Sequence, residues 1–268
     1  MSDPTSAFEH GLVDTHCHLD AAEFDADRAQ LVARAREAGV SEIVVPGINR
    51  QNFEQVAHIC EQYDLCRPAF GIHPLFVDQA DDEDLDLVRE RCKTEGVVAV
   101  GEIGLDFYCE GYDAERQVFF LSEQLKIARD LGLPVILHVR KAVDHVLKHL
   151  RRIEVPGGIA HAFNGSRQQA EILVAMGFKL GFGGAMTWER ARHIRGLAAT
   201  LPLESIVLET DAPDIPPEWV GKGRNEPGEL RKIAEVLAQI RGIAVVEIIA
   251  ATTQNARAAL PCIAPVKK

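Results

Sequence analysis

Long apolar runs and paired cysteines are both missing from this chain. No uninterrupted apolar segment approaches the roughly 20 residues that a membrane-spanning helix needs, and the first residues are not a basic region followed by an apolar one. The six cysteines are scattered and form no C-x-x-C pair, which is typical of free thiols and not of a disulfide framework or a zinc-thiolate site. We therefore expect a soluble cytoplasmic protein without a membrane anchor.

Basic and aromatic residues are also few. The net charge of -11 argues against a broad basic surface that binds duplex nucleic acid non-specifically. A nuclease is still allowed, because bound divalent cations and a few arginines can make one cleft locally positive. Aromatic residues make up only 6% of the chain; Phe107, Tyr108, Phe163 and Trp188 are the candidates for base stacking, and packing is the role that we expect for each.

No G-x-G-x-x-G turn follows the first apolar run, and no linker or change of composition divides the chain. Instead, short apolar runs alternate with helical patterns along the sequence. The first run ends in two histidines, and the later expected strands cover residues 41–47, 68–74, 96–105, 134–139, 157–161, 178–184 and 205–211. Eight such units in about 250 residues favour a closed (β/α)8 TIM barrel over a doubly wound open sheet. We predict one domain over residues 1–268, with residues 1–10 as a flexible lead-in.

The most informative stretch is Gly11 to Asp20, which contains His16 and His18. In an extended strand, residues i and i+2 project from the same face, so both imidazoles can converge on one point while Cys17 points away. Neutral imidazole is a common ligand for zinc and related metals. This pattern indicates a metal site, and two histidines placed by chance in a polar loop is the alternative.

Other ligand-type side chains follow the expected strands at their carboxyl ends, where the active site of a TIM barrel lies. These candidate metal ligands are His16, His18, Glu102, His138, His161 and Asp211. Four imidazoles and two carboxylates suit zinc, manganese or magnesium and are enough for two divalent ions bridged by a carboxylate. We expect Glu102 to be the bridge, and Asp211 to bind one ion and to accept a proton from its water.

Three further residues are candidates for binding substrate. His73 ends the third expected strand and could contact a phosphate, Arg140 lies two residues after His138, and Arg224 lies in the loop after the last strand. A structural histidine and two surface arginines are the alternatives. Glu209 shares a strand face with Asp211, and we expect it either to support the metal site or to pair with another polar group of the barrel core.

Several blocks, in this order, resemble the TatD family of metal-dependent hydrolases and together run from residue 12 to about residue 227. The blocks are Leu12-Val-Asp-Thr-His-Cys-His-Leu-Asp20, Gly71-Ile-His-Pro74, Gly101-Glu-Ile-Gly-Leu-Asp-Phe-Tyr108, Pro134-Val-Ile-Leu-His-Val-Arg140 with Asp144, His161-Ala-Phe-Asn-Gly165, Leu208-Glu-Thr-Asp-Ala-Pro213 and Arg224-Asn-Glu-Pro227. The resemblance implies a TIM barrel of the amidohydrolase superfamily, a divalent-metal-dependent deoxyribonuclease, and the six metal ligands named above. Leu75, Ala162 and Asn164 depart from the residues that the family often has at these positions.

Our leading hypothesis is therefore hydrolysis of phosphodiester bonds, with DNA, single-stranded or at 3′ ends, as substrate, and with no obligate protein partner. The second hypothesis keeps the metal site but makes the protein a hydrolase of an amide, a lactone or an aminoacyl ester, because fold and metal do not fix the substrate. Glu102 argues against it, since many amidases of the superfamily are expected to carry a modified lysine on that strand. A third hypothesis is a non-catalytic metal-binding protein, which the large ligand set disfavours.

Overall fold

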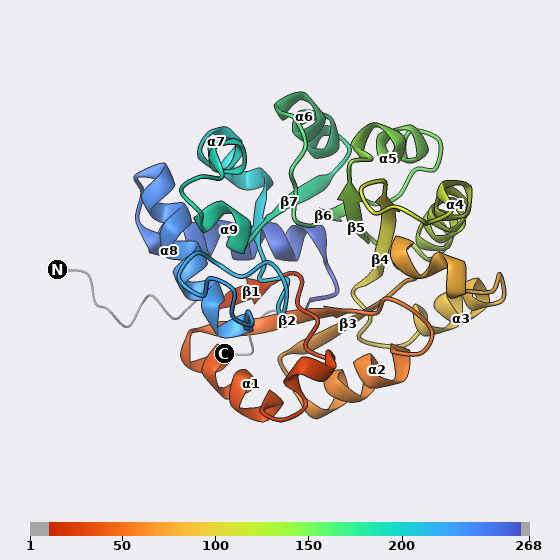
Figure 1. Cartoon of the computed structure of the whole chain (residues 1–268), viewed down its shortest axis with the longest axis horizontal. Coiled ribbons are helices and arrows are strands. Elements are labelled where there is room, and N and C mark those ends of the chain that lie inside the picture. The colour runs from red at the N-terminus through yellow and green to blue at the C-terminus, as the bar shows by residue number, and fades with distance from the viewer. Residues whose placement is uncertain (1–10, 264–268) are drawn as a thin grey trace.

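The computed structural model describes residues 11–263, so the expected lead-in at residues 1–10 lies outside the described residues. Eight parallel strands form one sheet in the order β1 to β8 (Figure 1), which confirms the predicted TIM-barrel fold. The strands are β1 (Leu12–Asp14), β2 (Val40–Pro46), β3 (Cys66–Phe70), β4 (Ala99–Asp106), β5 (Val135–Arg140), β6 (Gly158–Ala160), β7 (Phe178–Phe182) and β8 (Ile206–Leu208).

A helix follows each strand and lies outside the sheet, and a ninth helix ends the described chain. The helices are α1 (Arg28–Glu37), α2 (Phe53–Gln62), α3 (Asp84–Arg91), α4 (Ala114–Leu131), α5 (Val143–Leu150), α6 (Arg167–Ala175), α7 (Arg192–Thr200), α8 (Leu230–Arg241) and α9 (Val245–Ala259). Local signals fix their ends. Asp113, for example, accepts hydrogen bonds from the backbone N–H groups of Glu115 and Arg116 and so caps α4, which ends at Gly132 with φ 67°.

The barrel closes between the segments that follow β1 and β8. The N–H of Thr15 donates to the carbonyl of Leu208 (3.1 Å), and the N–H of Asp211 donates to the carbonyl of His16 (2.8 Å). A third bond joins the N–H of His18 to the carbonyl of Ala212 (2.8 Å). The first and last segments of the barrel, which are almost 200 residues apart in sequence, are therefore fixed side by side.

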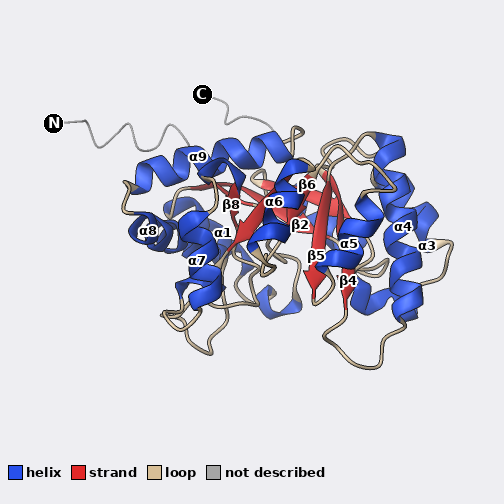
Figure 2. Cartoon of the chain, turned by 90° about the horizontal axis from the view of Figure 1, so that it is seen from above, coloured by secondary structure: helices blue, strands red, loops and turns tan. Residues whose placement is uncertain are grey.

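The interior of the barrel is apolar at the end where the strands begin. Its buried side chains come from the strands and from the last helix and the turn after it: Val13, Val44, Ala69, Val98, Ala99, Ile136, Ile159, Val207, Ala256, Ala259, Leu260 and Ile263. Helix α9 lies across this end, whereas the arrowheads of β4 and β5 point to the opposite side (Figure 2). The cluster of histidines and carboxylates described below lies at the opposite, carboxyl ends of the strands.

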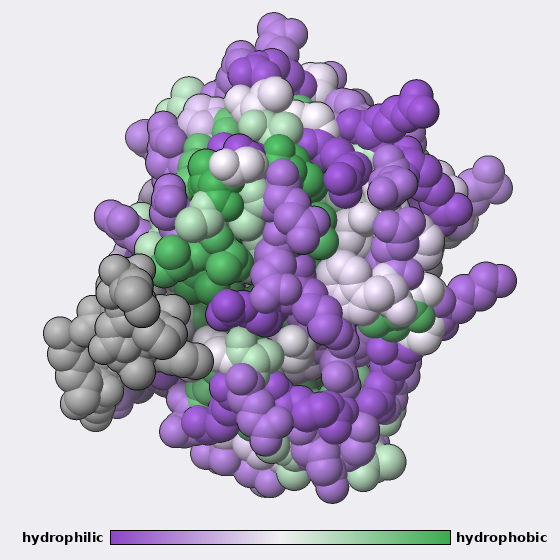
Figure 3. All heavy atoms as spheres, turned by 90° about the vertical axis from the view of Figure 1, so that its left-hand side faces the viewer, coloured by the Kyte–Doolittle hydropathy of each residue, from purple (hydrophilic) through white to green (hydrophobic). Residues whose placement is uncertain are grey.

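The face that carries α8 shows mostly hydrophilic residues around a smaller hydrophobic patch (Figure 3), since α8 buries Leu230, Ile233 and Leu237 against the barrel. Among residues 11–263, no helix combines the length and the apolar character that are needed to span a bilayer.

Candidate active site

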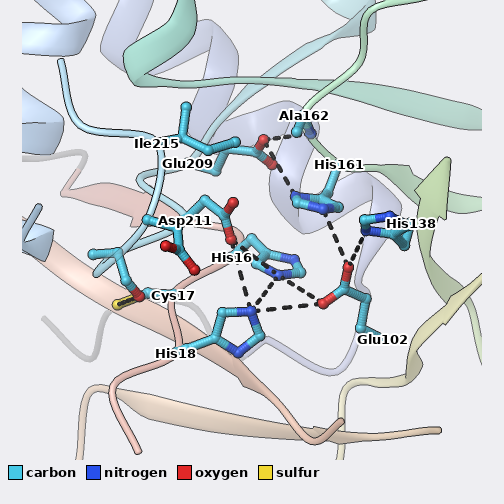
Figure 4. Close-up of polar contacts among 12 residues, drawn as sticks. His16, Cys17, His18, Glu102, His138, His161, Ala162, Glu209, Asp211 and Ile215 are labelled. Atoms are coloured by element: carbon cyan, nitrogen blue, oxygen red, sulfur yellow. Dashed lines mark hydrogen bonds and ion pairs between the residues drawn. The ribbon is translucent and has the colours of Figure 1, made fainter. Parts of the chain in front are cut away.

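The six predicted ligands meet at the carboxyl end of the barrel (Figure 4). On one side, the Nε2 atoms of His16 and His18 lie 3.3 Å apart. The Oδ1 of Asp211 lies 3.5 Å from the first of these nitrogens and 3.7 Å from the second. His16 and His18 thus converge as predicted and the buried Cys17 points away from them, although both histidines follow β1, which ends at Asp14, and do not lie within the strand.

The carboxylate of Glu102 lies between this group and the remaining histidines. Its Oε2 is 3.2 Å from His16 Nε2 and 3.6 Å from His18 Nε2. Its Oε1 is 2.9 Å from His138 Nδ1 and 3.2 Å from His161 Nε2. Each oxygen therefore faces a different pair of imidazoles, which is the arrangement that a carboxylate bridging two cations requires.

His73 lies inside the same cluster, with its Nε2 3.4 Å from Glu102 Oε1. Its Nδ1 accepts a hydrogen bond from the backbone N–H of Leu75 (3.1 Å). A neutral imidazole whose Nδ1 accepts carries its proton on Nε2, and burial lowers the pKa of His73, which favours the neutral form. In this geometry His73 presents a hydrogen-bond donor to the site and not a lone pair for a metal ion.

Asp106 is a site residue that we did not single out from the sequence. Its Oδ2 accepts a hydrogen bond from His138 Nε2 (3.0 Å), while His138 Nδ1 faces Glu102 Oε1 (2.9 Å) and, when protonated, donates to it; a bound cation would take the place of that proton. Its Oδ1 accepts the backbone N–H groups of Tyr108 (2.9 Å) and Cys109 (3.1 Å). An available signal was its position four residues after Glu102, on the same face of the same strand.

Asp14 and Thr210 form a second pair that the sequence analysis missed. The hydroxyl of Thr210 donates to Asp14 Oδ2 (2.6 Å), and the backbone N–H of Thr210 donates to Asp14 Oδ1 (2.9 Å). Asp14 precedes His16 by two residues and Thr210 directly precedes Asp211, so this buried pair fixes two ligands from opposite ends of the chain relative to each other.

Glu209 lies against His161. Its Oε1 accepts the backbone N–H of Ala162 (2.6 Å) and is 3.7 Å from His161 Nδ1. Gly181 makes room for this carboxylate, because a Cβ at that position would clash with it. Neither Glu209 Oε2 nor His161 Nδ1 has a hydrogen-bond partner among the described residues.

Burial and mutual charge shift the pKa values of the cluster. Burial lowers the pKa of His16 to about 3, and burial, opposed by His161 and His18, raises that of Asp211 to about 6. Although burial alone would lower it, the pKa of His161 is raised well above its usual value by Glu102 and Asp211. Asp211 and His161 therefore bind protons more strongly than usual, and a bound cation would displace these protons.

The donor set fits divalent metal ions. Three groups of potential ligand atoms lie within 4.8 Å of one another: His16, Glu102 and His161; His16, His18 and Asp211; and His73, Glu102 and His138. Imidazole nitrogens combined with carboxylate oxygens are the ligands that zinc and manganese prefer. Because His73 Nε2 carries a proton in this geometry, we assign the ligand role in the last group to Glu102 and His138.

The cluster opens into a cleft of about 1380 Å³. His73 and Arg140, two of the predicted substrate-binding residues, line this cleft. Arg224 is not among the lining residues. It forms two hydrogen bonds to the Asp27 carboxylate (2.9 and 2.7 Å) and a third to the carbonyl of Glu23, so the structure places it in a link between the β8–α8 loop and the segment before α1.

A parallel eight-stranded barrel with imidazoles and carboxylates at its carboxyl end defines a TIM-barrel metal-dependent hydrolase. The model of the family described as TatD related DNase matches residues 13–261, and the chain belongs to this family.

Individual relatives agree with this assignment. The Escherichia coli metal-dependent hydrolase YjjV is 40% identical over 247 residues, which cover 91% of this chain and 95% of that protein. The Erwinia amylovora protein named 3′-5′ ssDNA/RNA exonuclease TatD is 34% identical over 256 residues, 92% of this chain and 98% of that one. The crystal structure of E. coli YjjV matches with a TM-score of 0.89 and covers 93% of this chain and 98% of its own.

Proposed function

We propose that this metal-dependent hydrolase is a deoxyribonuclease that cleaves phosphodiester bonds in single-stranded DNA from the 3′ end. The observation that carries the proposal is the Glu102 carboxylate, each oxygen of which faces a different pair of imidazoles. Paired divalent cations are a common solution for displacement at phosphorus. A relative with 34% identity is named a 3′-5′ exonuclease for single-stranded DNA and RNA, which supports this substrate class.

Two divalent ions per chain, zinc, magnesium or manganese, are part of the proposal. His16, His18 and Asp211 would hold one ion, His138 and His161 would hold the other, and Glu102 would be shared. When bound, such ions lower the pKa of water toward neutrality and polarise a phosphoryl oxygen.

The other steps are assigned to side chains of the chain itself. Asp211 accepts the proton of the attacking water, and its raised pKa of about 6 makes it a stronger base than an exposed aspartate. His73 donates from Nε2 toward the cleft, where it can hold a substrate oxygen. Arg140 holds a phosphate next to the bond that is cleaved, since a guanidinium matches phosphate oxygens.

An acidic protein needs locally placed positive charge to bind a polyanion. The end of β5 supplies two cationic side chains, because Arg140 and Lys141 line the cleft, where Asp144 and other carboxylates also lie. Bound cations would add positive charge beside them, which favours a phosphate backbone despite the net charge of -11.

The remaining expectations are part of the same proposal. The six cysteines form no disulfide among residues 11–263, and three of them, Cys17, Cys66 and Cys92, are buried free thiols, which supports a reducing compartment such as the cytoplasm. One continuous eight-stranded sheet supports a single domain. Nothing in the proposed chemistry requires a second protein.

The test is hydrolysis of end-labelled oligonucleotides by chelator-treated protein to which zinc, magnesium or manganese is restored singly. We expect metal-dependent cleavage of a single strand, stepwise shortening from the 3′ end, and little cleavage of a blunt duplex. Asp211→Asn should lose most of this activity and keep its fold, as circular dichroism would show.

Two outcomes would overturn the proposal. Unchanged turnover in Asp211→Asn would exclude the assigned base. The second outcome is stoichiometric metal binding without cleavage of any phosphodiester, together with hydrolysis of an amide, a lactone or an aminoacyl ester. This result would favour the second hypothesis over a nuclease.

A further inference from the structure

Tyr108 does not have the packing role that we expected from the sequence. Phe163 is buried and Phe107 packs against the core, as expected, but Tyr108 is 57% exposed. Its ring lies in the segment after β4, and the residue lines the cleft that leads to the metal cluster. An exposed aromatic ring in the wall of an active-site cleft is a candidate contact for substrate.

The register of β4 and β5 places an arginine on this ring. Asp106 pairs with Arg140 across the two strands, and the backbone N–H of Phe107 donates to the carbonyl of Arg140 (2.9 Å). The guanidinium carbon of Arg140 consequently lies 3.9 Å from the centroid of the Tyr108 ring. A cation at this distance is attracted to the ring and helps to fix its orientation.

Tyr108 is also connected to the metal ligands through Asp106. One carboxylate oxygen of Asp106 accepts the Tyr108 backbone N–H, and the other contacts His138 Nε2. The position of the ring is therefore set relative to the reaction centre by two hydrogen bonds and a strand register, and not by a free loop.

We infer that Tyr108, backed by Arg140, is a stacking platform for a nucleobase of the substrate next to the bond that is cleaved. This inference rests on the proposed phosphodiesterase function and specifies how that site recognises its substrate. A base inside a duplex is already stacked between its neighbours, whereas a base of a single strand is free to turn onto the ring, so the platform favours single strands over duplexes. Stacking of this kind tolerates every base, because each base has a π face.

The experiment compares two oligodeoxythymidylates of equal length, one with normal and one with abasic tetrahydrofuran residues at its last three 3′ positions. We expect the wild-type protein to show a kcat/KM about tenfold higher for the normal strand, mainly through KM. Tyr108→Ala should lose this preference, and Tyr108→Phe, which keeps the ring, should restore it. Tyr112→Ala is the matched control, because Tyr112 is exposed nearby but does not line the cleft.

Each other result overturns the inference. If the wild-type protein does not distinguish the two strands, no base is stacked. If Tyr108→Ala keeps the full preference, another residue provides the platform, and if it lowers both activities equally, Tyr108 only supports Asp106. If the wild-type protein cleaves neither strand with any metal, the proposed function itself fails, and that outcome differs from the first three.

Discussion

In this site, the partner of one ring nitrogen of an imidazole decides whether the other ring nitrogen presents a lone pair or a proton to the centre. His138 has Asp106 at Nε2 and therefore offers Nδ1 to the centre, whereas His73 has the Leu75 N–H at Nδ1 and offers a proton. Two histidines that look equivalent in the sequence thus take different roles. Residue type and strand position were enough to predict that the six candidate ligands lie together. The Leu75 N–H, by contrast, is a backbone partner of His73 that no pattern of side chains in the sequence reveals.

Replacing Asp106 tests the first of these orientations. In Asp106→Asn, the amide oxygen can keep the bonds from Tyr108 and Cys109, but the amide nitrogen then faces His138 Nε2, which has no acceptor left. We expect metal affinity to fall roughly 10- to 100-fold with the fold retained. Competition with a fluorescent chelator measures this loss, and the exposed Asp78→Asn is the control. Equal affinities of Asp106→Asn and wild-type protein would show that the contact does not orient the ligand.

The protonation of Asp211 predicts how metal binding depends on pH. Burial raises its pKa to about 6, and a metal ion binds only the carboxylate. A proton on Asp211 competes with the ion below this pH, and a proton on His161, whose pKa is raised well above its usual value, competes at higher pH, so affinity should rise as the pH increases from 5 and should continue to rise above 7. Chelator competition for zinc at each pH measures the slope. Asp211→Asn removes one of the titrating groups and should reduce the slope between pH 5 and 7, and a slope identical to that of the wild-type protein would contradict this assignment.

Strand boundaries were less predictable than strand existence. Residues 205–211 read as one strand, yet β8 ends at Leu208, because the chain then bonds to the last residue of β1 through the Thr210–Asp14 pair. Helix α7 begins only at Arg192, because Trp188 is extended and its indole N–H donates to the carbonyl of Pro216 (3.1 Å). In both places a contact distant in sequence overrides the local apolar pattern.

The link between the ends of β1 and β8 should contribute to stability as well as to metal binding. Thr210→Val keeps the shape of the side chain but removes the hydroxyl that donates to Asp14 Oδ2, which leaves a buried carboxylate oxygen with one partner fewer. We expect the free energy of unfolding of the metal-free protein to fall by about 1–3 kcal/mol. Urea denaturation measures the loss, and Thr210→Ser, which keeps a hydroxyl, should recover most of it. A Thr210→Val protein as stable as the wild type would contradict a stabilising role for this pair.

The whole molecule has two distinct ends. Helix α9 closes the end where the strands begin with apolar side chains, and the carboxyl end carries the ligand cluster and the cleft. The alternation of apolar runs and helical patterns predicted the barrel and the end at which its ligands lie, because all strands are parallel. The place of α9 and the pairing of Arg224 with Asp27 could not be predicted, since both depend on contacts between segments far apart in sequence.

The central claim is that two divalent ions held around Glu102 support hydrolysis of a phosphodiester. Its most direct test is a titration of chelator-treated protein with manganese, in which the rate of cleavage of an end-labelled single-stranded oligonucleotide is followed against equivalents of metal added per chain. We predict negligible cleavage without metal and a rate that rises until two equivalents are bound. Full activity in the metal-free protein, or no cleavage of the oligonucleotide at any ratio of metal to protein, would contradict the account.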